Sequence, residues 1–192
     1  MFGSLLKLSF PGKIFVVVVI ICSTLLYSRY QKNKYIRLSA DNAAPILTKL
    51  PNLNLEIING KGVINTSALL GKTQGVFAHL WGTWCAPCEA ELPEFIKFAE
   101  KFKDKNVTFL LIAVNDDAKK IKKFIKRFGK LSPHIKFVLD SENQAMDQFG
   151  SGKVPETYVF EGSGIFMERF LGPQNWEMET YLQRTKNFLS LN

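Results

Sequence analysis

The pattern of apolar and polar positions divides the chain into a long apolar N-terminal run and a region of alternating short segments. Residues 14–28 carry no charge and are rich in Ile, Val and Leu. Beyond residue 50, apolar runs of strand length at 75–81 and 107–114 are each followed by a segment in which apolar residues recur every three or four positions. The apolar runs predict buried strands, and the recurring pattern predicts amphipathic helices.

The remaining segments extend this pattern to a whole domain. A β-hairpin is expected where residues 53–57 alternate, residues 59–62 form an Asn-Gly-Lys-Gly turn and residues 63–64 return. Helices are expected over 85–103, 116–128, 141–149 and 175–189, and short strands over 137–139, 157–160 and 165–170. This order predicts an α/β fold with a mixed central sheet flanked by helices.

The N-terminal apolar run predicts a single transmembrane helix. The fifteen residues 14–28 would span about 22 Å as a helix, less than the roughly 30 Å of a hydrocarbon core. Extension back to Phe10, with Lys13 snorkelling, gives a workable span. Two alternatives stay open: a cleaved signal peptide, although no A-x-A pattern is present, and lipidation of Cys22, although Ile21 stands where a small residue is expected. We therefore expect a membrane anchor at 1–28, a tether at 29–47 and a folded domain at 48–192.

The formal net charge of +8 does not indicate nucleic-acid binding. Residues 1–38 hold six of the 25 basic side chains and none of the 17 acidic ones, so the rest of the chain is nearly neutral. A lysine-rich cluster at 119–130 lies on the polar side of a predicted helix. Such a cluster is typical of a solvated face, with a docking surface for an acidic partner as the alternative. No nucleic-acid partner is expected.

The strongest chemical signal is the pair Cys85 and Cys88, which lies where a buried strand ends and a helix begins. The two-residue spacing lets the sulfur atoms meet across the first helical turn. The helix N-terminus stabilises a thiolate through its partial positive charge and free amide donors. Pro87 is tolerated there because its missing amide hydrogen has no helical partner in any case. After a β-strand, this spacing indicates a thioredoxin-like redox pair.

Two other interpretations of the pair are weaker. A zinc site needs four ligands, and only Cys22, His79 and His134 remain as further candidates. A purely structural disulfide would close too small a loop to stabilise the fold much. We therefore expect a redox-active disulfide with no metal ion or other cofactor.

Two motifs resemble the TlpA family of membrane-anchored, thioredoxin-fold oxidoreductases, which includes the ResA and DsbE (CcmG) proteins of cytochrome c maturation. One is Trp-Gly-Thr-Trp-Cys-Ala-Pro-Cys at 81–88, followed by Glu-Leu-Pro at 91–93; the other is Gly-Lys-Val-Pro-Glu-Thr-Tyr at 152–158, which is similar to the family's cis-proline loop. The resemblance covers about residues 48–190 and implies a thioredoxin-like fold. His79 departs from it, because the family usually carries Asn there. His79 is then either a buried residue satisfied by a neighbour or a functional histidine.

Position and resemblance together imply roles for the cysteines and a nearby acid. Cys85, at the helix terminus, is expected to be the exposed nucleophile, and Cys88 the resolving thiol. Glu91 follows Cys88 by three residues on the same helix face, and we expect it to accept or hand on the Cys88 proton. The alternative is that Glu91 simply complements the helix dipole.

Three further residues are expected to shape the substrate site. The resemblance implies that Pro155 is cis and brings the Val154 backbone opposite Cys85, where it can pair with an extended substrate. Trp84 is expected to cover the disulfide against water, with plain packing as the alternative.

The residues around the cysteines predict a reductase. Strong oxidants usually stabilise their thiolate with a cation or polar donor between the cysteines, and Ala86-Pro87 offers neither. Glu89, Glu91 and Glu94 add negative charge. The resemblance implies an oxidised protein as substrate, such as the haem-site cysteines of apocytochrome c, and a transmembrane thiol donor of electrons. The alternatives are a general envelope disulfide reductase acting, for example, on copper-delivery proteins, and a non-catalytic binding module of a maturation complex.

The resemblance also implies a location. Family members place the catalytic domain outside the cytoplasmic membrane, so we expect a single-pass protein of the bacterial cytoplasmic membrane with its domain on the periplasmic side. The flanking charges slightly favour the opposite orientation, because Lys7, Lys13 and the α-amino group precede the span and four cations follow it.

Overall fold

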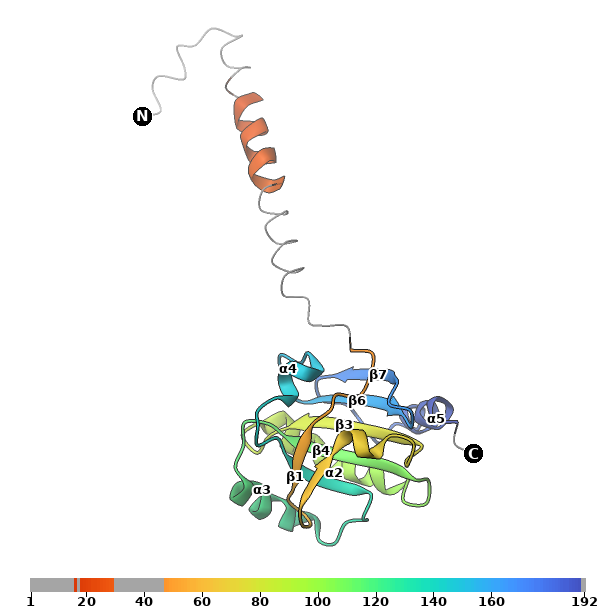
Figure 1. The fold of residues 1–192 in the computed structure, drawn as a ribbon. Coiled ribbons are helices and arrows are strands. Elements are labelled where there is room, and N and C mark those ends of the chain that lie inside the picture. Colours follow the sequence, from red (N-terminus) through yellow and green to blue (C-terminus); the bar gives the residue numbers. More distant parts are fainter. Residues whose placement is uncertain (1–15, 17, 30–46, 191–192) are drawn as a thin grey trace. The chain divides into compact units, whose positions relative to one another are not determined.

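The computed structural model describes residues 16, 18–29 and 47–190, and residues 47–190 form an α/β domain (Figure 1). Its strands are β1 (Asn54–Ile57), β2 (Val63–Asn65), β3 (Gly75–Trp81), β4 (Val107–Ala113), β5 (Ile135–Leu139), β6 (Glu156–Glu161) and β7 (Phe166–Leu171). Its helices are α2 (Ala86–Glu100), α3 (Ala118–Ile125), α4 (Ala145–Phe149) and α5 (Glu179–Phe188), with short 3-10 turns η2 (Thr66–Leu69) and η3 (Lys126–Phe128).

The seven strands form one mixed sheet in the order β2-β1-β5-β4-β3-β6-β7. β3, β4 and β5 run parallel, whereas β1, β2, β6 and β7 pair antiparallel with their neighbours. The N-terminal hairpin is formed by β1 and β2, with Asn54 opposite Asn65. The predicted mixed sheet flanked by helices is therefore confirmed.

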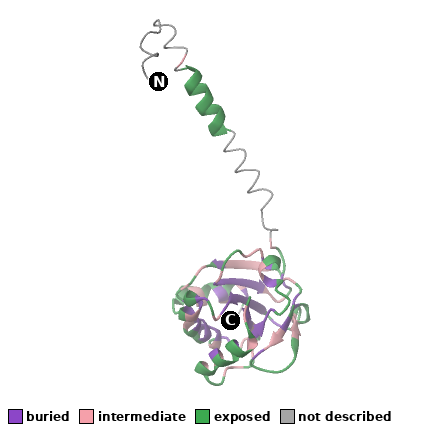
Figure 2. Cartoon of the chain, turned by 90° about the vertical axis from the view of Figure 1, so that its left-hand side faces the viewer, coloured by how far each residue is buried: buried purple, intermediate pink, exposed green. Residues whose placement is uncertain are grey.

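Apolar side chains fill both faces of the sheet. Successive residues of a strand point to opposite faces, so Phe77 and Trp81 of β3 join a core beneath α2, α3 and α5, whereas Val76 and Leu80 join a second core beneath α4. Figure 2 shows the buried residues concentrated in the central strands. This two-sided burial fixes the position of β3, whose last residues lead into the cysteine pair.

The helices differ from the predicted ranges at their ends, and local contacts explain two of these differences. The helix predicted from 141 begins only at Ala145, because the Asp140 carboxylate accepts hydrogen bonds from the backbone N–H groups of Gln144 (3.2 Å) and Ala145 (2.7 Å). α3 ends at Ile125 and continues as η3 until Gly129, whose φ of 66° stops the helix.

The predicted membrane location is wrong for the part of the chain that the structure describes. Residues 18–29 are helical and exposed. No helix within residues 16, 18–29 and 47–190 is long and apolar enough to cross a membrane, which contradicts the expected single-pass location in the bacterial cytoplasmic membrane. Residues 1–15, 17 and 30–46, on which much of the predicted anchor and tether falls, lie outside the described residues.

Candidate functional site

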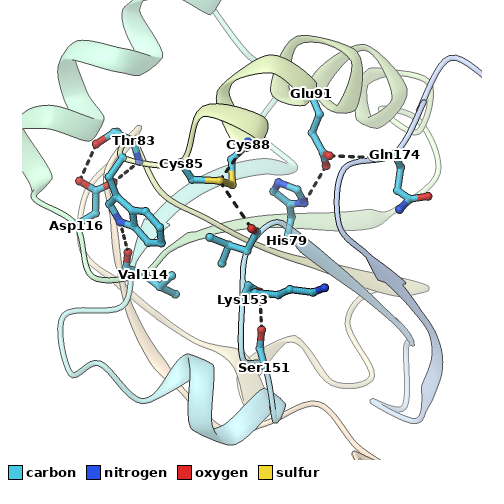
Figure 3. Close-up of a disulfide and its surroundings, with 12 residues drawn as sticks. His79, Thr83, Cys85, Cys88, Glu91, Val114, Asp116, Ser151, Lys153 and Gln174 are labelled. Atoms are coloured by element: carbon cyan, nitrogen blue, oxygen red, sulfur yellow. Dashed lines mark hydrogen bonds and ion pairs between the residues drawn. A yellow bond between two sulfur atoms is a disulfide. The ribbon is translucent and has the colours of Figure 1, made fainter.

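The cysteine pair lies at the start of α2, directly after the turn that ends β3. Cys85 is the N-cap residue of α2, and its Sγ accepts a hydrogen bond from the backbone N–H of Cys88 at 3.2 Å. The two cysteines form a disulfide with a Cα–Cα distance of 5.3 Å (Figure 3). The sulfur of Cys85 therefore occupies the place of a helix-capping oxygen.

The turn before Cys85 is fastened by Asp116, which follows β4. One carboxylate oxygen of Asp116 accepts from the backbone N–H of Thr83 at 2.6 Å and the other from its hydroxyl at 2.9 Å. The sequence indicated only that Asp116 and Asp117 begin a helix. Asp117 is the N-cap of α3, whereas Asp116 holds the loop beside the disulfide.

Trp84 lies folded back over this turn. Its indole N–H donates to the carbonyl of Val114 at 3.1 Å, and 57% of the residue remains exposed. A Cβ at Gly82 would lie 2.5 Å from the indole nitrogen, so only glycine leaves room for the ring. The indole is thus held in one orientation beside the disulfide, and its role as a cover stays a prediction.

The disulfide is less open than expected. Cys85 is only 6% exposed and Cys88 is fully buried. The reason lies in the loop before β6, where the carbonyl oxygen of Val154 is 3.9 Å from the Cys85 sulfur. The Val154–Pro155 peptide bond is cis, as the resemblance implied. Cys85 is still the more accessible of the two cysteines.

A buried carboxylate that was not predicted as a site residue from the sequence anchors the cis-proline loop. Glu156 is 1% exposed, and its Oε2 accepts hydrogen bonds from Ser151, Tyr158 and Arg169, each at 2.7 Å. The Arg169 guanidinium compensates the buried charge. The Pro-Glu-Thr motif contains this glutamate, but the motif does not indicate which side chains donate hydrogen bonds to it.

Glu91 lies on the buried face of α2 and is only 5% exposed. Its Oε1 accepts from the indole N–H of Trp176 at 3.1 Å, and its Oε2 accepts from the backbone N–H of Gln174 at 3.0 Å. Both donors belong to the segment before α5, which begins at Glu179 rather than near 175. Burial raises the pKa of the Glu91 carboxyl to about 7, although the two hydrogen bonds favour the ionised form and Glu94 opposes it.

His79 lies in the middle of β3 with no exposed surface. Its Nδ1 is 2.8 Å from the hydroxyl oxygen of Thr157, its partner on β6, and 3.8 Å from Oε1 of Glu91. The imidazole stacks on Phe95 with ring centroids 4.5 Å apart. Burial lowers the pKa of His79 to about 3, which keeps the ring neutral.

The site thus contains the six residues that the sequence predicts for it, and its disulfide lies at the start of α2, facing the cis-proline loop. These residues are Trp84, Cys85, Cys88, Glu91, Val154 and Pro155. Within the described ranges, no group of three or more His, Cys, Asp or Glu side chains is placed to hold a metal ion. A dithiol–disulfide pair with a buried carboxyl on the same helix is chemically suited to thiol–disulfide exchange.

Comparison with known proteins agrees with this chemistry. The Redoxin family model matches residues 46–184. The thiol-disulfide oxidoreductase ResA of Bacillus subtilis (strain 168) is 35% identical over 128 residues, covering 67% of this chain and 68% of the relative. A ResA of Bacillus cereus is 28% identical over 171 residues, covering 88% of this chain and 92% of the relative.

A solved structure shares the fold. The thiol:disulfide interchange protein, a thioredoxin family protein, from Chlorobium tepidum TLS matches with a TM-score of 0.60 at 23% identity, covering 74% of this chain and 96% of that chain. The chain therefore belongs to the Redoxin family and is a thiol-disulfide oxidoreductase of the TlpA/ResA/DsbE type with a thioredoxin-like fold.

Proposed function

We propose that this oxidoreductase acts as a reductase of protein disulfides, with the haem-attachment cysteines of an apocytochrome c as its substrate and a transmembrane thiol carrier as its electron donor. The observation that carries the direction of electron flow is the buried carboxyl of Glu91 on the helix face of Cys88. A strong oxidant stabilises its thiolate, whereas a carboxylate at this place opposes a thiolate.

The other neighbours of the disulfide support the same direction. Ala86 and Pro87 place no cation between the cysteines. Glu89 adds a carboxylate to the first turn of α2, and Arg127 pairs with it at 3.6 Å, with 59% of the arginine side chain exposed. Because an exposed ion pair is weak, the reduced form gains little stabilisation from this arginine.

The exchange reaction assigns a step to each cysteine. The Cys85 thiolate attacks the substrate disulfide, and one substrate sulfur leaves as a thiolate. Cys88 then loses its proton and attacks the Cys85 sulfur, so that the Cys85–Cys88 bond forms as the mixed disulfide breaks. The substrate gains two electrons and the enzyme loses two. The carbonyl of Val154, 3.9 Å from the Cys85 sulfur, is placed to accept a backbone hydrogen bond from an extended substrate.

The redox potential tests the direction. We expect a value below about −200 mV, nearer to thioredoxin at about −270 mV than to a strong oxidase at about −120 mV. Equilibration of the protein with glutathione redox buffers measures it. A potential close to that of the strong oxidases would refute the assignment as a reductase.

The substrate can be identified by trapping. A Cys88→Ser variant keeps the nucleophile but cannot resolve the mixed disulfide, so the partner stays bound to Cys85. Recovery of an apocytochrome c bound through its haem-site cysteines would support the proposal, and consistent recovery of other proteins instead would refute it. A Cys85→Ser variant, treated in the same way, is the control for non-specific capture.

The role of Glu91 has its own test. If its carboxylate interacts with the thiols, Glu91→Gln should lower their apparent pKa, because a nearby negative charge is removed. Alkylation rates of the reduced protein across pH measure this pKa. Glu89→Gln removes a first-turn acid of the same helix and serves as the control. Superimposable curves for all three proteins would reduce Glu91 to an acid that complements the helix dipole.

A further inference from the structure

The imidazole of His79 projects from β3 towards α2, the helix that carries the cysteine pair, and contacts Glu91 and Phe95 there. Alternation along β3 places His79 on the same face as Phe77 and Trp81, beneath α2. Figure 3 shows the ring directed at the Glu91 carboxylate. It therefore belongs to the site through its position in the fold.

Its hydrogen bonding is incomplete. Nδ1 contacts the Thr157 hydroxyl at 2.8 Å, whereas Nε2 is buried without a hydrogen-bond partner in the described structure. An unsatisfied buried nitrogen costs free energy and calls for an explanation. Stacking on Phe95 and the contact with Thr157 account for the ring and for Nδ1, but not for a nitrogen at the Nε2 position.

Glu91, on the other side of this contact, has hydrogen-bond donors but no positively charged partner. Both of its oxygens accept hydrogen bonds from neutral donors, Trp176 and Gln174. Its ionisable neighbours are Glu94, which repels its charge, and His79, whose Nδ1 lies 3.8 Å from Oε1. His79, neutral in the resting protein, is thus the neighbour whose protonation would offset the charge of a buried carboxylate that otherwise faces neutral donors.

We propose that His79 is a positioning residue of the redox centre, which together with Glu91 forms a buried pair that takes up one proton as a unit when Cys88 is deprotonated. This inference rests on the proposed function of the Cys85–Cys88 pair. In the resting pair the imidazole is neutral. When Glu91 loses its proton, the negative charge left behind favours protonation of His79, so the two groups titrate together rather than independently.

The pair completes the proton balance of the resolving step. The Cys88 thiol gives its proton to the ionised Glu91–His79 pair, and the resulting thiolate attacks the Cys85 sulfur. The bond between Cys85 and the substrate breaks, the electron pair leaves on the substrate sulfur, and the disulfide forms. The substrate thiolate takes a proton from solvent, and the pair later returns its own proton to solvent. Two electrons pass from the enzyme to the substrate.

Nuclear magnetic resonance of the full-length protein tests the coupling directly. With ¹⁵N-labelled histidine and ¹³C-labelled glutamate, we expect the ring nitrogen shifts of His79 to change with the same pH midpoint as the Glu91 carboxyl. In Glu91→Gln the His79 shifts should stay constant between pH 5 and 9. His134, whose Nε2 contacts the carbonyl of Ala99 at 3.0 Å, is the internal control and should give the same ring nitrogen shifts in both proteins.

His79→Asn supplies a second measurement, because an amide can keep the contact with Thr157 but takes up no proton. We expect the Glu91 midpoint to rise by about one pH unit, since a potential counter-charge is lost. The alkylation profile of the thiols should shift with it, and His134→Asn should change neither. His79 shifts that ignore the Glu91 transition in the wild-type protein would overturn the inference, as would an unchanged Glu91 midpoint in a folded His79→Asn variant.

The titration does not depend on turnover, so the two proposals can fail separately. A protein that reduces no insulin disulfides but shows the linked His79 and Glu91 transitions would refute the proposed function and support the pair. An active reductase with unlinked transitions would refute the pair alone.

Discussion

Among the individual residues, Glu91 shows how strongly burial can change a side chain. The same carboxyl on the surface would be ionised at any pH above about 5. Here it is 5% exposed and its pKa is raised to about 7. Because the folded chain holds this proton more tightly than the unfolded chain, Glu91 makes the stability of the protein depend on pH.

We predict the direction in which the free energy of unfolding changes with pH. Between the ordinary Glu91 pKa of 4.5 and its folded value of about 7, the folded state binds a proton that the unfolded state has lost. The free energy of unfolding should therefore fall as the pH rises through this window. Relative to Glu91→Gln, the wild-type protein should lose up to about 3 kcal/mol, at about 1.4 kcal/mol per pKa unit.

Denaturant unfolding of both oxidised proteins at several pH values between 4 and 8.5 measures this difference. Burial of His79 acts in the opposite direction below pH 6.5 in both proteins. Glu89→Gln should follow the wild-type curve. Parallel curves for wild type and Glu91→Gln would contradict the prediction.

Which residues could be predicted from the sequence depended on the range of their contacts. The spacing of Cys85 and Cys88 and the offset of Glu91 are local, and one helical turn brings these residues together. Asp116 contacts Thr83 across 33 residues, and Trp176 contacts Glu91 across 85. No periodicity records such contacts, because they exist only after the sheet has brought distant segments side by side.

Among the elements, α2 and α3 depend on two adjacent aspartates with different tasks. Asp117 caps α3 by accepting from the backbone N–H groups of Lys119 (2.9 Å) and Lys120 (3.1 Å). Asp116 instead fastens the turn that leads to α2 through Thr83. The periodicity predicted both helices, but neighbouring acids at a helix start could not be distinguished without the contacts of β3 and β4.

Because Asp116 holds the turn before α2 and Asp117 caps α3, we expect different effects when each is replaced by alanine. Asp117→Ala should cost about 1 kcal/mol of stability, as for other helix caps, and leave the rate of disulfide reduction unchanged. Asp116→Ala should cost about 1–3 kcal/mol, because it leaves the Thr83 donors unpaired, and should lower the reduction rate severalfold. Thermal unfolding and insulin reduction measure the two effects. Equal effects of both variants on activity would contradict this assignment.

At the scale of the whole molecule, the residues just before β1 complete the sheet. Pro45–Asn192 forms one compact unit. Within it, the backbone N–H of Leu50 donates to the carbonyl of Gly164 at 2.8 Å, and that of Phe166 donates to the carbonyl of Thr48 at 3.0 Å. Residues 48–50 thus lie along the turn into the edge strand β7, and Leu50 is buried in the second core. The hydrophobic pattern gave no strand here, because a single bridge between Lys49 and Ile165 leaves no periodicity.

Truncation tests the importance of this segment. A chain that begins at Pro45 should keep the melting temperature of the domain and its rate of disulfide reduction. A chain that begins at Leu53 should melt roughly 5 °C lower or more, since it loses the two backbone hydrogen bonds and the burial of Leu50. Equal melting temperatures for the two chains would show that residues 48–50 contribute nothing to stability.

The capping role of Cys85 has a further consequence. Most helix caps are hydroxyls, amides or carboxylates that stay the same throughout the life of the protein. At the start of α2 the capping atom is the Cys85 sulfur, which is in turn a disulfide, a thiolate and half of a mixed disulfide. The cap is strongest when the sulfur is a thiolate, because charge strengthens a hydrogen-bond acceptor. By thermodynamic reciprocity, whatever the thiolate contributes to the helix, the helix returns to the reduced form. The extra stability that the thiolate gives to the first turn of α2 is therefore equal to the stabilisation that this turn gives to the reduced protein.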